Sequence, residues 1–102
     1  MNQDIQGRNE VLRLHGEMTI YRAGELAQQV LSALRQQPLP HIDLSEVTEF
    51  DTAGMQILLL AHRFAAASEM RLAIVNPSEC VREVLTLCNL THLIDAQAEL
   101  AS

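Results

Sequence analysis

The chain has 102 residues, of which 48% are hydrophobic and 20% charged, as in one soluble globular domain. We therefore expect a single domain over residues 1–102 with its core at about residues 10–95. The formal net charge is −6 and the seven Lys and Arg residues are scattered, which argues against a nucleic-acid partner. The longest strongly apolar run, residues 57–61, is too short to span a bilayer, so we expect no direct membrane insertion.

The N-terminal sequence and the cysteines predict a cytoplasmic protein. The first ten residues, M-N-Q-D-I-Q-G-R-N-E, are polar and do not have the apolar centre of a secretory signal peptide. Cys80 and Cys88 fall on one predicted helix, where the rise between them is about 12 Å, too far for a disulfide. Free thiols without an export signal are typical of the cytosol.

A strand and a helix are predicted first. Residues 10–15, E-V-L-R-L-H, alternate apolar and polar side chains as a short strand does, and Gly16 is expected to end it. Residues 21–37 place their apolar side chains on one stripe of a helix, with polar and charged side chains outside. Pro38 and Pro40 are expected to end this helix.

A second strand and helix follow. Residues 41–44 alternate around two apolar side chains and are predicted to form a strand, followed by a polar loop at residues 45–49. Asp51 and Thr52 both stand where the N-cap of a helix belongs. The apolar run of residues 53–67 is predicted to be that helix.

The last third of the chain continues the alternation. Residues 72–75 form a short apolar run, as in a strand covered on both faces. Residues 76–77, Asn-Pro, have the form of an N-cap and first position of a helix over residues 78–88. Residues 93–94 are predicted as a last short strand, and the tail after Asp95 as a short helix. Alternation of this kind predicts an α/β fold with a small, mostly parallel sheet and helical crossovers.

Motifs for catalysis and for metal binding are absent from the sequence. His92 follows Cys88 by four residues, which is half of a zinc site, and no other cluster completes it. Neither a G-x-S-x-G nucleophile motif nor a phosphate-binding G-x-x-x-x-G-K-[ST] loop occurs. Asp43 and Asp51 could still meet at the strand ends as a carboxylate pair. We predict a protein that is not an enzyme and that has no metal and no cofactor.

The segment of residues 42–60 is the most informative part of the chain. It leads from a strand into an acidic loop and then into D-T-A-G, which opens a helix. The first N–H groups of a helix are unpaired and partially positive, so a phosphate would be stabilised there. A hydroxyl at this turn is therefore a plausible phosphoacceptor. The alternative is that Asp51 or Thr52 simply caps the helix.

The helix predicted over residues 53–67 is apolar on more than one side. The side expected to face the sheet carries Ile57, Leu58, Ala61, Phe64, Ala65 and Ser68. A further strip of Met55, Leu59 and Ala66 runs beside His62. Either a neighbouring helix or the terminal segment covers this strip, or it is an exposed apolar patch on which a partner docks.

Three segments resemble, in the same order, the STAS domain of bacterial anti-sigma-factor antagonists. They are G-E-M-T-I-Y-R-A-G-E-L, I-D-L-S-E-V-T-E-F-D-T-A-G-M-Q and R-L-A-I-V-N-P-S-E-C-V-R-E-V-L-T-L-C-N-L. The resemblance covers residues 12–94. It implies a STAS fold, a small sheet with helices packed against it, and a function in docking onto partner proteins.

The resemblance also points to specific residues of the turn. In anti-sigma-factor antagonists a serine directly before the glycine of the turn is phosphorylated by a partner kinase, which blocks binding. The matching position, before Gly54, is Ala53, so Thr52 becomes the candidate phosphorylation site. Asp51 matches the acidic residue of the family before the turn, whereas Thr19 stands where an acidic residue often follows G-E-[LM]. Because of both departures, at Ala53 and Thr19, the resemblance does not imply regulation by the usual kinase.

The D-T-[AG]-G form of the turn resembles two subgroups with different partners. One is the stand-alone STAS proteins of bacterial chemosensory and two-component signalling, which the run A-G-M-Q-I-L-L-L favours. The other is the small STAS subunit that binds the ATPase of an ABC-type phospholipid transporter. The partner is thus a kinase-like or anti-sigma-like regulator, or a transporter ATPase. The predicted partner-binding residues are Asp51, Thr52, Ala53, Gly54, Met55, Gln56 and Leu59.

Overall fold

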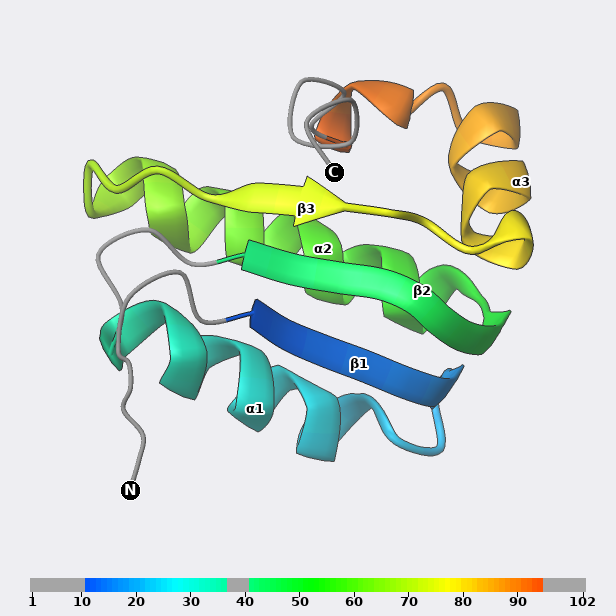
Figure 1. The fold of residues 1–102 in the computed structure, drawn as a ribbon, viewed down its shortest axis with the longest axis horizontal. Helices are drawn as coiled ribbons and strands as arrows, with labels where there is room; N and C mark the ends of the chain where they lie inside the picture. Colours follow the sequence, from blue (N-terminus) through cyan, green and yellow to red (C-terminus); the bar gives the residue numbers. More distant parts are fainter. Residues whose placement is uncertain (1–10, 37–40, 95–102) are drawn as a thin grey trace.

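The structure, a computed structural model, describes residues 11–36 and 41–94. Its elements are, in order, β1 (Val11–Met18), α1 (Ala23–Gln36), β2 (His41–Phe50), α2 (Thr52–Ala67), β3 (Ala73–Val75), α3 (Glu79–Leu87) and a 3-10 turn, η2 (Thr91–Leu93). Within these residues, three strands pair in parallel in the order β1-β2-β3 (Figure 1). The predicted α/β fold with a parallel sheet is confirmed.

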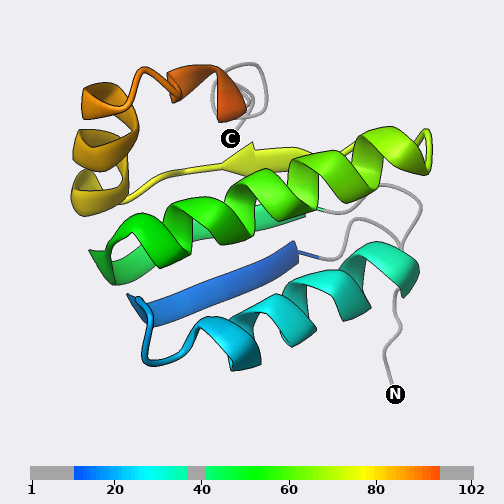
Figure 2. The ribbon, with the colours of Figure 1, turned by 180° about the vertical axis from the view of Figure 1, so that it is seen from behind.

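The long helices α1 and α2 lie side by side on the same face of the sheet (Figure 2). Each crosses from the end of one strand to the start of the next, as parallel pairing requires. The helix α3 and the turn η2 follow β3 at the edge of the sheet (Figure 1). The apolar core lies where these elements meet. Its most completely buried side chains are Leu14, Met18, Leu26, Val30, Leu34, Ile42, Leu44, Leu58, Ala61, Ile74, Val81 and Leu85.

Both longer strands extend past the ends predicted for them. Gly16 does not end β1, since the strand continues to Met18. Within the strand Gly16 adopts a φ of +83°, a conformation open to glycine. The expected loop at residues 45–49 belongs to β2, where Val47 and Phe50 are buried. At two places β2 contains one residue more than the stretch of β1 with which it pairs, as in β-bulges. The bulges place two exposed residues between buried ones, so the strict alternation that marks a strand is lost.

The predictions around α3 also need correction. The prediction of Asn76 as an N-cap is wrong, because α3 begins at Glu79 with Ser78 in the N-cap position. Asn76 instead takes a φ of +55°, a left-handed conformation that asparagine tolerates better than most residues. The strand predicted at residues 93–94 is also wrong. This stretch lies at the end of the 3-10 turn η2, which inserts Leu93 into the core.

The helix boundaries agree with the sequence prediction to within two residues at each described end. Glu10, Gln37, Pro38 and Pro40 lie outside the described residues, as does the helix predicted after Asp95. No helix in the described part of the chain has the length and apolar character needed to cross a bilayer.

Candidate functional site

The carboxylate of Asp51 joins the start of α2 to the loop that precedes α1. Its Oδ1 accepts hydrogen bonds from the backbone N–H of Ala53 at 2.8 Å and of Gly54 at 3.3 Å. Its Oδ2 accepts from the N–H of Ile20 at 3.3 Å. Of the two predicted caps, Asp51 is the one that the structure uses, and Thr52 is already the first helical residue. Two loops that are far apart in the sequence are thereby fixed to each other.

Asp51→Ala should lower the free energy of unfolding by about 1–2 kcal/mol, since two N–H groups of α2 and that of Ile20 lose their acceptor. Asp51→Asn retains a side-chain oxygen in the same place and should cost less. Urea denaturation of both variants measures the difference. Equal stability of Asp51→Ala and the wild type would contradict the capping role.

Gly54 lies where α2 passes closest to the ends of β1 and β2. A Cβ at this position would lie 2.5 Å from the carbonyl oxygen of Met18 and 2.9 Å from two ring carbons of Phe50. The N–H of Asp51 donates to the same oxygen of Met18 at 3.3 Å, which holds the turn against β1. Gly54 is buried, so it contributes to the site by letting the backbone of the turn approach the sheet.

Thr52, the candidate phosphorylation site, is exposed at the first position of α2. The N–H groups of Ala53 and Gly54 that would favour a phosphate already donate to Asp51. A phosphate on Thr52 would therefore stand beside the capping carboxylate of Asp51 and repel it. Modification here would act on the contact between Asp51 and Ile20 as well as on the surface of the turn.

The strip of Met55, Leu59 and Ala66 is only partly free. Met55 and Leu59 are half-buried and pack against the edge of the core, whereas Ala66 is exposed. Beside them, Nε2 of His62 lies 3.2 Å from the carbonyl oxygen of Leu93 in η2. The segment after α3 thus adjoins the strip at His62, whereas Ala66 stays exposed and Leu59 lines an open groove, so neither alternative holds for the whole strip. Leu59 was expected outside the core and is in fact at its margin.

Two residues assigned to the sheet-facing side of α2 are less buried than that side requires. Ser68 is exposed and is the C-cap of α2, because the helix has ended there. Phe64 is half-buried, and the guanidinium of Arg35 in α1 lies 5.9 Å from the centre of its ring. Phe64 therefore contributes to the α1–α2 contact.

An open groove of about 650 Å³ runs between α1 and α2. Its lining comprises Ile20, Ala23, Gly24, Ala27, Ala53, Gln56, Ile57, Leu59, Leu60 and Arg63. Ala53, Gln56 and Leu59, predicted to bind a partner, are thus brought together on one surface. Ile20 is 67% exposed and Leu60 37% exposed. Sequence reasoning missed both, although the apolar Ile20 stood outside every strand and helix pattern, which was a usable signal.

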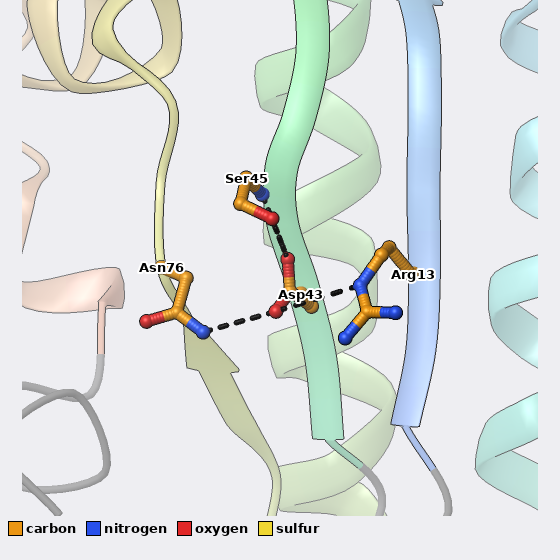
Figure 3. A network of polar contacts seen from close by, with 4 residues as sticks. All are labelled: Arg13, Asp43, Ser45 and Asn76. Atoms are coloured by element: carbon orange, nitrogen blue, oxygen red, sulfur yellow. Dashed lines mark hydrogen bonds and ion pairs between the residues drawn. The ribbon is translucent and has the colours of Figure 1, made fainter. Parts of the chain in front are cut away.

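Asp43 is a buried carboxylate in β2, on the face of the sheet opposite to α2 (Figure 3). Its Oδ1 accepts from the N–H of Ser45 at 2.8 Å and from the hydroxyl of Ser45 at 2.6 Å. Its Oδ2 accepts from Nδ2 of Asn76 at 2.9 Å and lies 3.8 Å from Nε of Arg13. Burial alone would raise the pKa of Asp43, but the bonds from Ser45 and Asn76, with the charge of Arg13, hold it below the ordinary value.

The carboxylate pair considered from the sequence does not form. Asp43 lies within β2 whereas Asp51 follows its end, and eight residues of strand separate them by about 25 Å. Each carboxylate has its own hydrogen-bond partners. Asp43 accepts from Asn76, which follows β3, and Asp51 accepts from the N–H of Ala53 at the turn. In the described segments no three His, Cys, Asp or Glu side chains gather as a metal site requires.

A parallel sheet covered on one face by two helices, with an acid-capped turn opening the second, defines a STAS-like fold. The structure of the anti-sigma factor antagonist SpoIIAA in its unphosphorylated form superimposes with a TM-score of 0.70. The identity is 19%, over 91% of this chain and 83% of that chain. The Bacillus cell fate determinant SpoIIAA in its phosphorylated form gives a TM-score of 0.66 at 19% identity, over 91% and 86%. At this identity the likeness shows the fold.

The family is shown by the sequence itself. The family model described as "Mlab, STAS domain" matches residues 1–95. This chain therefore belongs to the STAS-domain family, as the three motifs indicated. A comparison with curated proteins finds no match.

Proposed function

We propose that this protein is a non-enzymatic docking module that binds a partner protein through the D-T-A-G turn and the adjoining surface of α2. The observation that carries the proposal is the position of the groove. Ala53, which occupies the phosphoserine position of the family, lines the groove, and the exposed Thr52 precedes it. A modification or contact at the turn therefore adjoins an exposed apolar surface, as a regulated docking site requires.

The partner we propose is a regulator of a bacterial chemosensory or two-component pathway in the cytoplasm, either kinase-like or anti-sigma-like. Membership of the STAS family and the SpoIIAA-like fold support a regulatory role. The alternative partner, the ATPase of a phospholipid transporter, would use the same turn. The identity of the captured partner distinguishes these two.

Affinity capture from native lysate with mass spectrometry tests the proposal. The wild type is compared with Leu60→Asp, which places a charge in the groove, and with Leu87→Asp on α3, where the side chain is 86% exposed. A partner held by the wild type and by Leu87→Asp but lost from Leu60→Asp is the expected result. Equal capture by all three, or a hydrolase activity abolished by Asp51→Asn, would refute the proposed function.

Thr52→Glu should weaken binding of the partner, because a carboxylate beside Asp51 imitates the charge of a phosphate. Thr52→Ala should bind the partner constitutively. Isothermal titration with the captured partner gives both affinities, and mass spectrometry of the native protein reports the phosphosite. Loss of binding in Thr52→Ala, with its thermal melt unchanged, would identify Thr52 as a direct contact instead of a switch.

A further inference from the structure

The groove between α1 and α2 is long enough for about three turns of another helix. The lining residues of α2 run from Ala53 to Arg63, a rise of about 15 Å or nearly three turns. On the opposite wall, α1 contributes Ala23, Gly24 and Ala27, all of them small. A Cβ built on Gly24 meets no atom within 4 Å, so this wall is open to a close approach.

The walls of the groove favour a helix over an extended segment. Both walls are helices, whose interior N–H and C=O groups are already paired within each helix. The walls therefore present no row of free backbone groups to which a strand could add. A helix satisfies its own backbone and can bury one apolar face against Ile20, Leu59 and Leu60.

The charge at the rim specifies the partner further. Among the described residues that line the groove, Arg63 is the one that carries a charge, and it is exposed. At the start of α1, Glu25 pairs with Arg22, which precedes the helix, at 3.3 Å, so these two charges offset each other. Arg35 of α1 lies over the ring of Phe64, the residue after Arg63, and adds a second positive charge. An otherwise acidic chain, with a net charge of −6, thus presents the positive charge of Arg63 beside an apolar surface.

We propose that this groove binds an amphipathic helix of about three turns, supplied by the partner protein, whose apolar face carries aliphatic residues. A carboxylate at the edge of that helix pairs with Arg63. This inference rests on the proposed function, because it names the part of the partner that occupies the docking surface. It adds α1, the loop residue Ile20 and the charge of Arg63 to the residues of the turn.

Photo-crosslinking of the full chain in native lysate tests which molecule, and which segment of it, occupies the groove. A photoreactive amino acid replaces Leu60 in one sample and the exposed Leu87 of α3 in the control. An adduct at position 60 alone is expected, and mass spectrometry should map it to an amphipathic segment with Asp or Glu at its edge. An adduct with a second copy of this chain, with a basic segment or with a segment that is extended in the partner would overturn the proposal.

Affinity measurements with the captured partner test the charge and the shape of the groove. Arg63→Glu should weaken binding about tenfold, and Arg63→Lys should retain most of it. Gly24→Gln should weaken binding by filling the groove, whereas Gly24→Ala should bind nearly as the wild type does. Unchanged affinity in both Arg63→Glu and Gly24→Gln would refute the proposal.

The two proposals fail in different ways. If the wild type captures a partner whose binding responds to substitutions at Thr52, but no adduct forms at position 60, the helix-binding groove is refuted and the docking function is retained. If the wild type captures no partner, both are refuted.

Discussion

Gly54→Ala is expected to destabilise the domain by about 3 kcal/mol, the upper part of the usual range for overpacking. The added methyl group would lie 2.5 Å from the carbonyl oxygen of Met18. That oxygen is backbone at the end of β1 and also accepts the N–H of Asp51, so it cannot move without breaking this bond. Two ring carbons of Phe50, 2.9 Å away, would also have to move. Thermal and urea denaturation measure the loss.

Gly24→Ala is the matched control, because Gly24 is also a helical glycine but its Cβ has open space. Alanine there should stabilise the protein by about 0.5–1 kcal/mol, since glycine has the poorer helix propensity. Opposite signs for the two substitutions would show that the cost at Gly54 is steric. A Gly54→Ala variant as stable as the wild type would show that the turn can retreat from β1.

Asp43→Leu is expected to lower the free energy of unfolding by about 3 kcal/mol, because it removes the acceptor of several hydrogen bonds in a partly buried network. Ser45 and Asn76 lose hydrogen bonds, and Arg13 loses its ion-pair partner. Asp43→Asn is the control. It retains an oxygen for Ser45 and should cost about half as much. Equal stability of Asp43→Leu and the wild type would show that the network adds no more stability than the packing of a leucine.

The same carboxylate predicts how stability depends on pH. The pKa of Asp43 is lower in the folded state than its ordinary value of 3.8, so folding favours the ionised form. Its contribution is therefore complete above the pKa of the unfolded chain and is lost as the pH falls through about 4 and below. Melting temperatures between pH 7 and pH 3 should fall more steeply for the wild type than for Asp43→Asn. Parallel curves would contradict this.

The order and identity of the helices and the parallel sheet followed from the sequence, because they depend on local periodicity. The apolar stripe of α1 recurs with the period of a helix, and Leu26, Val30 and Leu34 are buried as that stripe requires. The turn at Asp51 was predictable for the same reason, since a cap acts on the N–H groups two and three residues later. The three motifs also sufficed for the family.

What only the tertiary structure decided concerns contacts between residues far apart in the chain. The bulges of β2 arise from its register with β1, so no pattern within residues 45–49 shows them. The groove exists because Ile20, Gly24 and Leu60 come from separate elements that pack together. Asp43 is likewise ionised while buried because strand pairing places Arg13 and Asn76 on either side of it. Local periodicity determines which face of each element is apolar, but the packing of the elements determines which apolar side chains stay exposed.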